Sequence, residues 1–242
     1  MFRHQGKTRT LSHNLKIASL LSFIAGLVNV AGYFAVQRLT TNVTGHFAFF
    51  MDEVFKLNFW EGFVYFLYIF FFFAGSFLSS FIIEIIAKKS DHYIYIIPAS
   101  IECLILFVFG IFGTSLIIES PNTIAFGLLF AMGLQNSLVT TISGSVVRTT
   151  HLTGLFTDLG IELSQLFFYK EVQQKIKLVS SIKLRFTIIG FFFIGGIVGG
   201  FLYSKIGLHS LTIAAIVLSA GLVYDNIKFR FILLKRKLKS NA

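Results

Sequence analysis

Long apolar runs, bounded by charged residues, proline or asparagine, dominate the chain. A helix that crosses about 30 Å of hydrocarbon needs about 20 apolar residues. Runs of that length predict six transmembrane helices, near residues 15–38, 62–87, 93–118, 122–147, 186–204 and 208–227.

Two shorter segments, residues 46–57 and 155–168, also have a helical pattern. At about 1.5 Å per residue they reach only about 18 to 21 Å, which is too short to cross a membrane. Each carries acidic residues, so we expect re-entrant or interfacial helices sheltered by the rest of the protein. The pattern as a whole predicts an all-α integral membrane protein.

Composition supports this class. Of the 242 residues, 55% are hydrophobic and only 13% are charged, and the mean hydropathy is +0.78. These values exclude a soluble domain, and the 31 Phe and 8 Tyr residues exclude a disordered chain. Cys103 is the single cysteine, so the chain cannot build an internal disulfide framework.

The net charge of +10 is distributed unevenly between the predicted loops. Only Arg38, Lys56 and Lys205 fall on one side of the membrane in the six-helix arrangement, and all other basic residues fall on the opposite side. The positive-inside rule then predicts both termini in the cytoplasm. The charge therefore reflects membrane orientation, and we expect no nucleic-acid partner. The first apolar run is too long for a secretory signal and is expected to be a span.

A six-residue motif occurs twice. TTNVTG at residues 40–45 recurs as TTHLTG at residues 149–154. Further matches pair residues 26–29 with 133–136, Phe47 with Phe156, Glu53 with Glu162, Leu57 with Leu166, and residues 71–76 with 191–196. Matches that keep the same order indicate an internal repeat.

The repeat predicts two halves of opposite orientation. Each half contains three spans, an odd number, so the second half must enter the membrane from the other side, as in many transporters. A duplication that merely stabilises a helix bundle is the alternative. The predicted organisation is a cytoplasmic basic N-terminus, two membrane repeats and a basic amphipathic tail on the anionic inner leaflet, at residues 1–14, 15–118, 119–227 and 228–242.

Two pairs of motifs point to a known family. AGLVNVAGYF followed by TTNVTGH, and MGLQNS followed by TTHLTG, resemble the YoaK family of multi-span bacterial membrane proteins, a domain of unknown function. The resemblance covers nearly the whole chain and implies a bacterial cytoplasmic membrane protein. Asn29 stands where that family usually has Asp, and His46 stands where it usually has Asn.

Polar residues inside the predicted spans are the first candidates for a solute site. Asn29, Gln135 and Asn136 lie near the middle of the first and fourth spans, and the repeat makes Asn29 and Asn136 symmetry mates. We expect the two amides to face each other and to contact a small polar solute, or to form an interhelical clasp. Glu102, near the middle of the third span, is either a proton or cation site or a hydrogen-bonded structural group.

The repeated motifs are the second candidates. Thr44 and Thr153 are predicted helix N-caps, and Gly45 and Gly154 allow close approach to the start of each short helix. Unpaired N–H groups at a helix start favour an anion or a carbonyl oxygen. Ordinary capping of two short helices is the alternative.

Other polar residues flank these motifs. Asp158 and Glu162 share one helical face, because they are four residues apart, and would line an inward-facing vestibule or a solvated surface. His46 and His151 would titrate near neutral pH or, more commonly for such positions, anchor the chain at the membrane interface.

These features predict a transporter or facilitator, either carrier or channel, with a midplane site for a small polar or anionic solute. A non-catalytic scaffold or lipid-interacting protein is the alternative. The sequence has no HExxH and no paired midplane aspartates, so we expect no enzyme activity, metal or cofactor. Membrane lipids are the expected partners. Small-residue ladders on the second and fifth spans would pack these helices or form a homodimer face.

Overall fold

The computed structural model describes residues 10–88 and 94–240, with side chains described as far as residue 227. Arg3, Lys7, Arg9, Lys89 and the side chains of the basic tail, which entered the charge prediction, lie outside this range. The described chain contains helices and no strands. The helices are α1 (Leu11–Val36), α2 (Val43–Phe55), α3 (Phe59–Ala87), α4 (Ile96–Glu119), α5 (Pro121–Ser143), α6 (Leu152–Phe168), α7 (Val172–Ile206) and α8 (His209–Ser240).

Six of these helices are long and apolar enough to cross a membrane, namely α1, α3, α4, α5, α7 and α8 up to Ile227. The short helices α2 and α6 correspond to the two segments predicted to be too short. The all-α architecture with six membrane-length helices is therefore confirmed.

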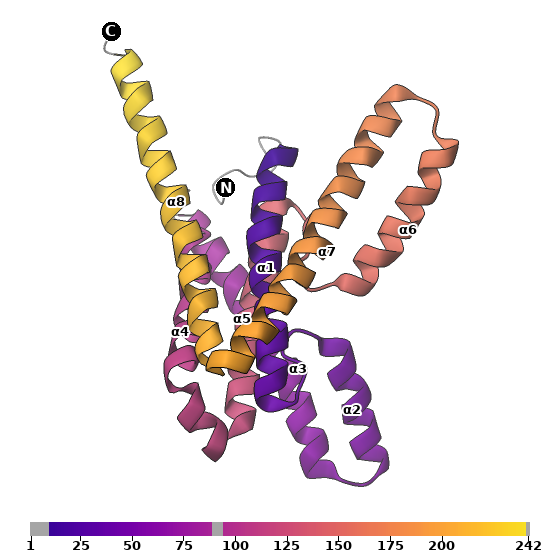
Figure 1. Ribbon diagram of the computed structural model, residues 1–242, viewed down its shortest axis with the longest axis vertical. Helices are drawn as coiled ribbons and strands as arrows, with labels where there is room; N and C mark the ends of the chain where they lie inside the picture. The colour runs from indigo at the N-terminus through magenta and orange to yellow at the C-terminus, as the bar shows by residue number, and fades with distance from the viewer. Residues whose placement is uncertain (1–9, 89–93, 241–242) are drawn as a thin grey trace.

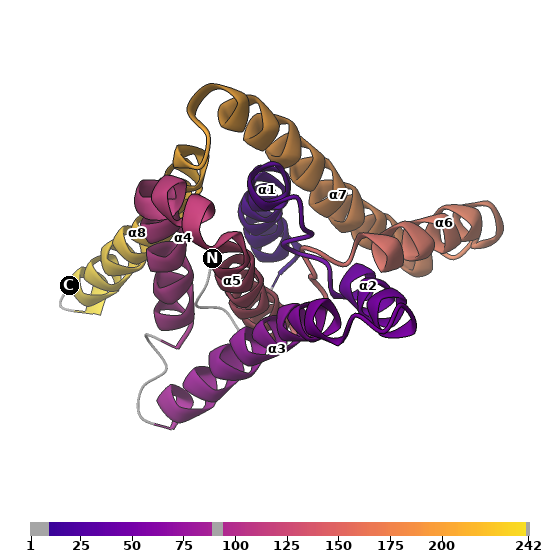
Figure 2. The same cartoon turned by 90° about the horizontal axis from the view of Figure 1, so that it is seen from below.

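Helices α1 and α5 occupy the centre of the bundle (Figure 2). They are the most buried of the six membrane-length helices. Helix α7 packs along α1, helix α3 packs along α5, and α4 packs against both α5 and α8. The outer helices expose many large apolar side chains, as expected where a helix faces lipid.

The fifth membrane helix begins much earlier than predicted. Helix α7 starts at Val172, whereas hydropathy alone placed this span at residues 186–204. Lys175, Lys177 and Lys183 interrupt the apolar run, but lysine is a good helix former, so the helix continues where the hydrophobic run does not. At about 1.5 Å per residue, α7 is about 52 Å long and extends well beyond a bilayer core.

Two other boundaries differ from the hydropathy pattern. Helix α5 ends at Ser143, because Gly144 adopts a left-handed conformation with φ of 63° that terminates the helix. Helix α8 continues without interruption into the basic tail as far as Ser240. The predicted tail is therefore an extension of the last membrane helix.

Glycines allow the two closest helix crossings. A Cβ atom on Gly26 of α1 would overlap the carbonyl oxygen of Phe192 on α7, and a Cβ atom on Gly133 of α5 would overlap that of Phe72 on α3. Small residues let helix backbones approach to this distance, and the resulting van der Waals contacts stabilise helix association in a membrane. The small-residue ladders of α3 and α7 thus pack inside the bundle.

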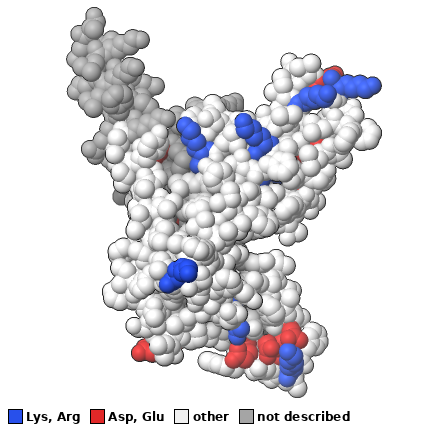
Figure 3. Space-filling model, viewed as in Figure 1, with Lys and Arg blue, Asp and Glu red and all other residues white. Residues whose placement is uncertain are grey.

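Each short helix folds back on the membrane-length helix that follows it. Helix α2 packs on the start of α3, and α6 packs on the start of α7. Figure 1 shows these two hairpins at opposite ends of the molecule, the α2–α3 hairpin at the lower end and the α6–α7 hairpin at the upper end. Figure 3 shows most of the visible acidic side chains at the lower end, whereas basic side chains are visible at both ends.

Candidate functional site

The chain leaves α1 through a short non-helical break, residues 37–42, before α2 begins. Two threonines of this break reach back to the middle of α1. Thr41 Oγ1 donates a hydrogen bond to Asn29 Oδ1 at 2.7 Å, and Thr40 Oγ1 donates to the carbonyl oxygen of Val28 at 3.3 Å. The break is therefore fastened to a polar position inside a membrane-length helix.

The second break, residues 144–151, is fastened to α5 in the same way. Asn136 Nδ2 donates to Thr150 Oγ1 at 2.6 Å. Gln135 Nε2 donates to Thr149 Oγ1 and to the carbonyl oxygen of Leu21 on α1, both at 3.0 Å. Gln135 Oε1 is buried and has no hydrogen-bond partner.

The side-chain amides of α1 and α5 thus form hydrogen bonds with threonines of the break that follows the same helix. No hydrogen bond within the described structure joins Asn29 to Asn136, although α1 and α5 are in contact. A buried hydrogen bond contributes about 0.5–1.5 kcal/mol, and leaving its partner unsatisfied costs about 1–3 kcal/mol. These bonds position the breaks and leave Gln135 with one unused acceptor.

The helix caps differ from the prediction. Thr44 and Thr153 lie inside the first turns of α2 and α6, so they are not the N-caps. Asn42 caps α2 by accepting a hydrogen bond from the Gly45 N–H at 3.1 Å. Asparagine competes well for this role because its side-chain oxygen reaches the first-turn amides.

At the start of α6 the N-cap is His151, whose side chain makes no capping hydrogen bond. The first-turn N–H groups of a helix have no partner within the helix. A side chain on Gly154 would overlap the His151 ring, so the glycine allows the ring to lie against the helix start. The start of α6 is therefore less fully satisfied than that of α2.

The His46 side chain is fully buried, whereas an anchor at the membrane interface would be exposed. Its Nε2 atom lies 2.6 Å from the carbonyl oxygen of Leu39, and its ring packs against those of Tyr65 and Tyr68. Burial lowers the pKa of the His46 imidazole, and the nearby Arg38 charge lowers it further, while the hydrogen bond to Leu39 acts in the opposite direction.

The aromatic cluster around His46 ties α2 to the bundle. Tyr68 is completely buried, and its hydroxyl group donates a hydrogen bond to Asn122 Oδ1 at the start of α5. The Arg38 guanidinium lies 5.7 Å from the centre of the Tyr65 ring. Aromatic side chains and Arg38 are therefore packed together beside the first break.

A cavity of about 560 Å³ lies beside the second break. Gly154 is the one residue of the eight predicted to bind a solute that lines this cavity. The cavity is lined by the side of the break, by the start of α6 and by α7, through Ser145, Val146, Arg148, His151, Gly154, Leu155, Asp158, Ser181, Leu184 and Arg185.

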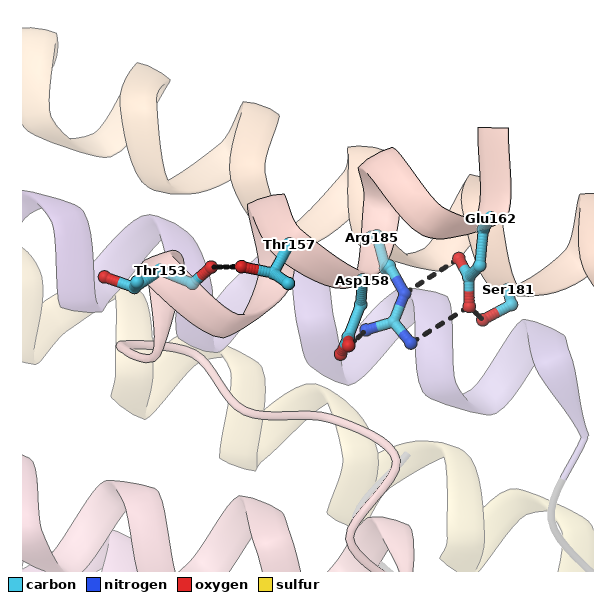
Figure 4. Close-up of polar contacts among 6 residues, drawn as sticks. All are labelled: Thr153, Thr157, Asp158, Glu162, Ser181 and Arg185. Carbon is cyan, nitrogen blue, oxygen red and sulfur yellow. Dashed lines mark hydrogen bonds and ion pairs between the residues drawn. The ribbon is translucent and has the colours of Figure 1, made fainter. Parts of the chain in front are cut away.

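An ion-pair cluster joins α6 to α7 beside the cavity, and its members Asp158, Ser181 and Arg185 line the cavity (Figure 4). Arg185 donates two hydrogen bonds to Glu162, from Nε to Oε2 at 2.8 Å and from Nη2 to Oε1 at 2.9 Å. Its Nη1 lies 2.9 Å from Asp158 Oδ2. Ser181 Oγ also donates to Glu162 Oε1 at 2.6 Å. The cluster fixes the orientation of α6 on α7.

Glu102 lies apart from this cavity, on α4. The residue is fully buried, and neither carboxyl oxygen has a hydrogen-bond partner in the described structure. On the same helix, Cys103 contacts α8 through Ser219 Oγ at 2.9 Å. No hydrogen bond joins Glu102 to the amides of α1 and α5 in the described structure.

Sequence reasoning found Asp158 and Glu162 as a shared face but missed Arg148, Arg185 and Tyr68. Arg185 had a detectable signal, because it lies immediately before the apolar run predicted to be the fifth span. The pairing of Tyr68 with Asn122 had none, since the two residues are far apart in the chain. No group of three or more metal-ligating side chains is present among the residues described.

The membrane-length helices, the two short folded-back helices and the fastened breaks define a multi-pass helical membrane protein. The chain belongs to the family described as "Protein of unknown function (DUF1275)", which matches residues 17–224. No curated protein and no solved structure matches the chain.

Proposed function

We propose that the protein is a transporter or facilitator of a small solute, built from two inverted repeats. The first repeat would contain α1 to α4, and the second α5 to α8. In such proteins, alternating access arises when one half changes its packing relative to the other. The chemistry is passage of a solute, and no bond is made or broken.

Matching helix crossings support the inverted repeat. The packing of Gly26 on the Phe192 carbonyl has its counterpart in the packing of Gly133 on the Phe72 carbonyl. The sequence matches pair the same positions, Gly26 with Gly133 and Phe72 with Phe192. Both central helices therefore use the same contact to bind a helix of the other repeat.

Matching hydrogen bonds are the second support. The Thr41–Asn29 bond and the Thr150–Asn136 bond join equivalent residues in the two halves. Each fastens a break to the middle of the preceding long helix. We interpret the breaks as paired gates, one at each end of the molecule.

The observation that carries the transport proposal is a difference between the two halves. In the first half, His46 and Tyr65 pack together beside the break. The equivalent positions in the second half are Leu155 and Arg185, one residue before the matched Phe156 and six before the matched Phe191. Both line the cavity of about 560 Å³. Packed aromatic side chains at one break and a cavity at the other are the arrangement expected of a protein that alternates access.

The same proposal gives an orientation. The basic side chains at the end of the molecule that carries the α6–α7 hairpin favour the cytoplasmic side for that end (Figure 3). Both termini would then be cytoplasmic, in a bacterial cytoplasmic membrane, and the cavity would be open to the cytoplasm. We further propose that the chain is a YoaK-type member of its family, on the motifs around Asn29 and Asn136.

Uptake into proteoliposomes tests the function. Purified protein would be reconstituted and screened with labelled neutral, anionic, cationic and aromatic solutes. We expect saturable flux of at least one class, reduced by Thr150→Val, which removes the hydroxyl group that Asn136 binds. Absence of flux for every class would reject the transport proposal.

Topology is tested by cysteine labelling in a Cys103→Ser background. Thr44→Cys and Thr153→Cys would be modified by membrane-impermeant reagents added to one side of oriented vesicles. The inverted repeat predicts labelling from opposite sides. Labelling of both positions from the same side would contradict it.

A lipid-interacting scaffold is the second candidate, and one observation favours it. The tip of the α6–α7 hairpin exposes Phe167, Phe168 and Val172 beside Lys170. Exposed aromatic residues beside lysines bind an anionic membrane surface. The scaffold predicts that Thr150→Val has no effect on activity in cells at unchanged protein level, whereas the transporter predicts a defect.

A further inference from the structure

The cavity beside the second break combines an unpaired cation with an apolar wall. Three arginines have described side chains. Arg38 lies over the Tyr65 ring and Arg185 is bound by two carboxylates, whereas Arg148 makes no hydrogen bond or ion pair with the described part of the chain. Its guanidinium is therefore the available positive charge of the cavity.

Further donors lie on the same cavity. A guanidinium has five N–H groups, and Glu162 and Asp158 engage three of those on Arg185. Two N–H groups remain for another acceptor. The uncapped start of α6 at His151, which also lines the cavity, adds first-turn N–H groups and the positive end of a helix dipole.

Acidic side chains are fewer than basic ones at this cavity. Asp158 is the acid that lines the cavity, and one of its oxygens is already held by Arg185. Glu162 lies among the same contacts but does not line the cavity. Among the charged side chains that line the cavity, Arg148 and Arg185 outnumber Asp158, which favours an anion over a cation.

The remaining wall is hydrocarbon. Val146, Leu155 and Leu184 line the cavity from the break, α6 and α7. A volume of about 560 Å³ falls within the range of about 300–1,000 Å³ that is typical of small-molecule sites. A ligand with one oxyanion group and a short apolar part would match both kinds of wall.

We infer that this cavity binds a small organic anion, with its oxyanion group on Arg148 and its hydrocarbon part against Val146, Leu155 and Leu184. The inference rests on the proposed transport function and names the solute class for it. The oxyanion chemistry is shared with anionic lipid headgroups, so the test must separate a free solute from lipid.

Binding is measured with purified protein in a nonionic, lipid-free detergent. Butyrate and benzoate are compared with butyramide and benzamide, which have nearly the same shape without the charge. We expect the two carboxylates to raise the melting temperature in a saturable way and the two amides to have little effect. Phosphatidylglycerol in place of the carboxylates tests the lipid source. A response to phosphatidylglycerol without a response to carboxylates would overturn the inference.

Variants identify the cation. Losing a hydrogen bond to a charged group weakens binding about tenfold or more, so we expect this effect on benzoate from Arg148→Gln. Arg148→Lys should retain part of the affinity. Lys205→Gln is the matched control, because it removes one exposed positive charge from the far end of α7. An equal loss of affinity in Lys205→Gln and Arg148→Gln would also overturn the inference.

Flux separates this inference from the proposed function. The proteoliposome screen is repeated with the same carboxylates and amides on the Arg148 variants. Carboxylate flux that Arg148→Gln reduces supports both proposals. Flux of amides as fast as carboxylates overturns the anion site but retains transport, whereas absence of flux for every solute class rejects transport itself.

Discussion

The carboxylate of Glu162 on α6 and the guanidinium of Arg185 on α7 are joined by two parallel hydrogen bonds of 2.8 and 2.9 Å. Their side chains are only 13% and 21% exposed. Two-point recognition of this kind is stronger than a single bond and fixes the relative orientation of both groups. This pair is the main polar contact that holds α6 on α7, since α6 otherwise buries only Leu155 and Leu159.

We expect Glu162→Gln to destabilise the protein by about 1.5–3 kcal/mol, because Arg185 loses a charged partner in a partly buried site. Thermal unfolding in detergent, followed by intrinsic fluorescence, measures the change. Asp52→Asn is the matched control, since it breaks an exposed ion pair with Lys56 on α2 and exposed pairs contribute little. Equal melting temperatures for Glu162→Gln and the parent protein would show that the pair is not stabilising.

The glycine crossings predict opposite effects for two substitutions on α7. A Cβ atom on Gly195 would overlap the carbonyl oxygen of Phe23 on α1, so we expect Gly195→Ala to cost about 1–3 kcal/mol through overpacking. Gly190 has no neighbour within 4 Å of a Cβ position, so Gly190→Ala should be neutral or stabilise by up to about 1 kcal/mol. Comparable destabilisation by both alanines would contradict the close crossing.

His46 predicts a dependence of stability on pH. Because burial lowers the pKa of its imidazole from 6.5, the unfolded chain binds the proton more readily than the folded chain. The contribution of the neutral His46 side chain to the free energy of unfolding is therefore fully present above about pH 6.5. It is lost as pH falls through the lowered pKa of His46 in the folded protein. We expect the melting temperature to decrease between pH 7.5 and pH 5.

His46→Gln retains an N–H donor for the Leu39 carbonyl but does not titrate, so it should flatten this pH dependence. His151→Gln, which removes an exposed histidine elsewhere in the chain, is the matched control variant. If the parent and His46→Gln have parallel pH profiles, the buried imidazole is not the cause.

We expect substitution of Glu102 to affect thermal stability and transport differently. Its carboxyl group is buried within α4 without a hydrogen-bond partner, and an unpaired carboxylate inside a protein is costly. We expect Glu102→Gln, a neutral group of the same shape, to leave the melting temperature unchanged or to raise it.

Proteoliposome flux at several pH values completes this test. If Glu102 couples a proton to transport, flux in the parent protein will depend on pH, and Glu102→Gln will remove that dependence. Flux that does not vary with pH in the parent protein would refute proton coupling at this residue.

Much of the architecture was predictable from the chain itself. Membrane-length apolar runs specified the helices, because a helix satisfies its own backbone in lipid and the bilayer thickness sets its length. The boundary of α7 at Val172 was missed because its first turns carry lysines, which hydropathy penalises and helix propensity does not. The repeated motifs located both breaks, although they did not identify Asn42 as a cap.

The site depended on contacts between distant residues. From sequence, Asn29 and Asn136 were equally able to face each other or to bind a threonine, since an amide satisfies either partner. Each break folds back on the preceding helix, and this places Thr41 beside Asn29 and Thr150 beside Asn136. The cavity likewise depends on tertiary structure. The sequence contains Arg148, but the packing of α6 and α7 determines which charged side chains of the cavity form ion pairs. Local physics sets which segments are helical, and tertiary packing sets which polar groups remain free to bind.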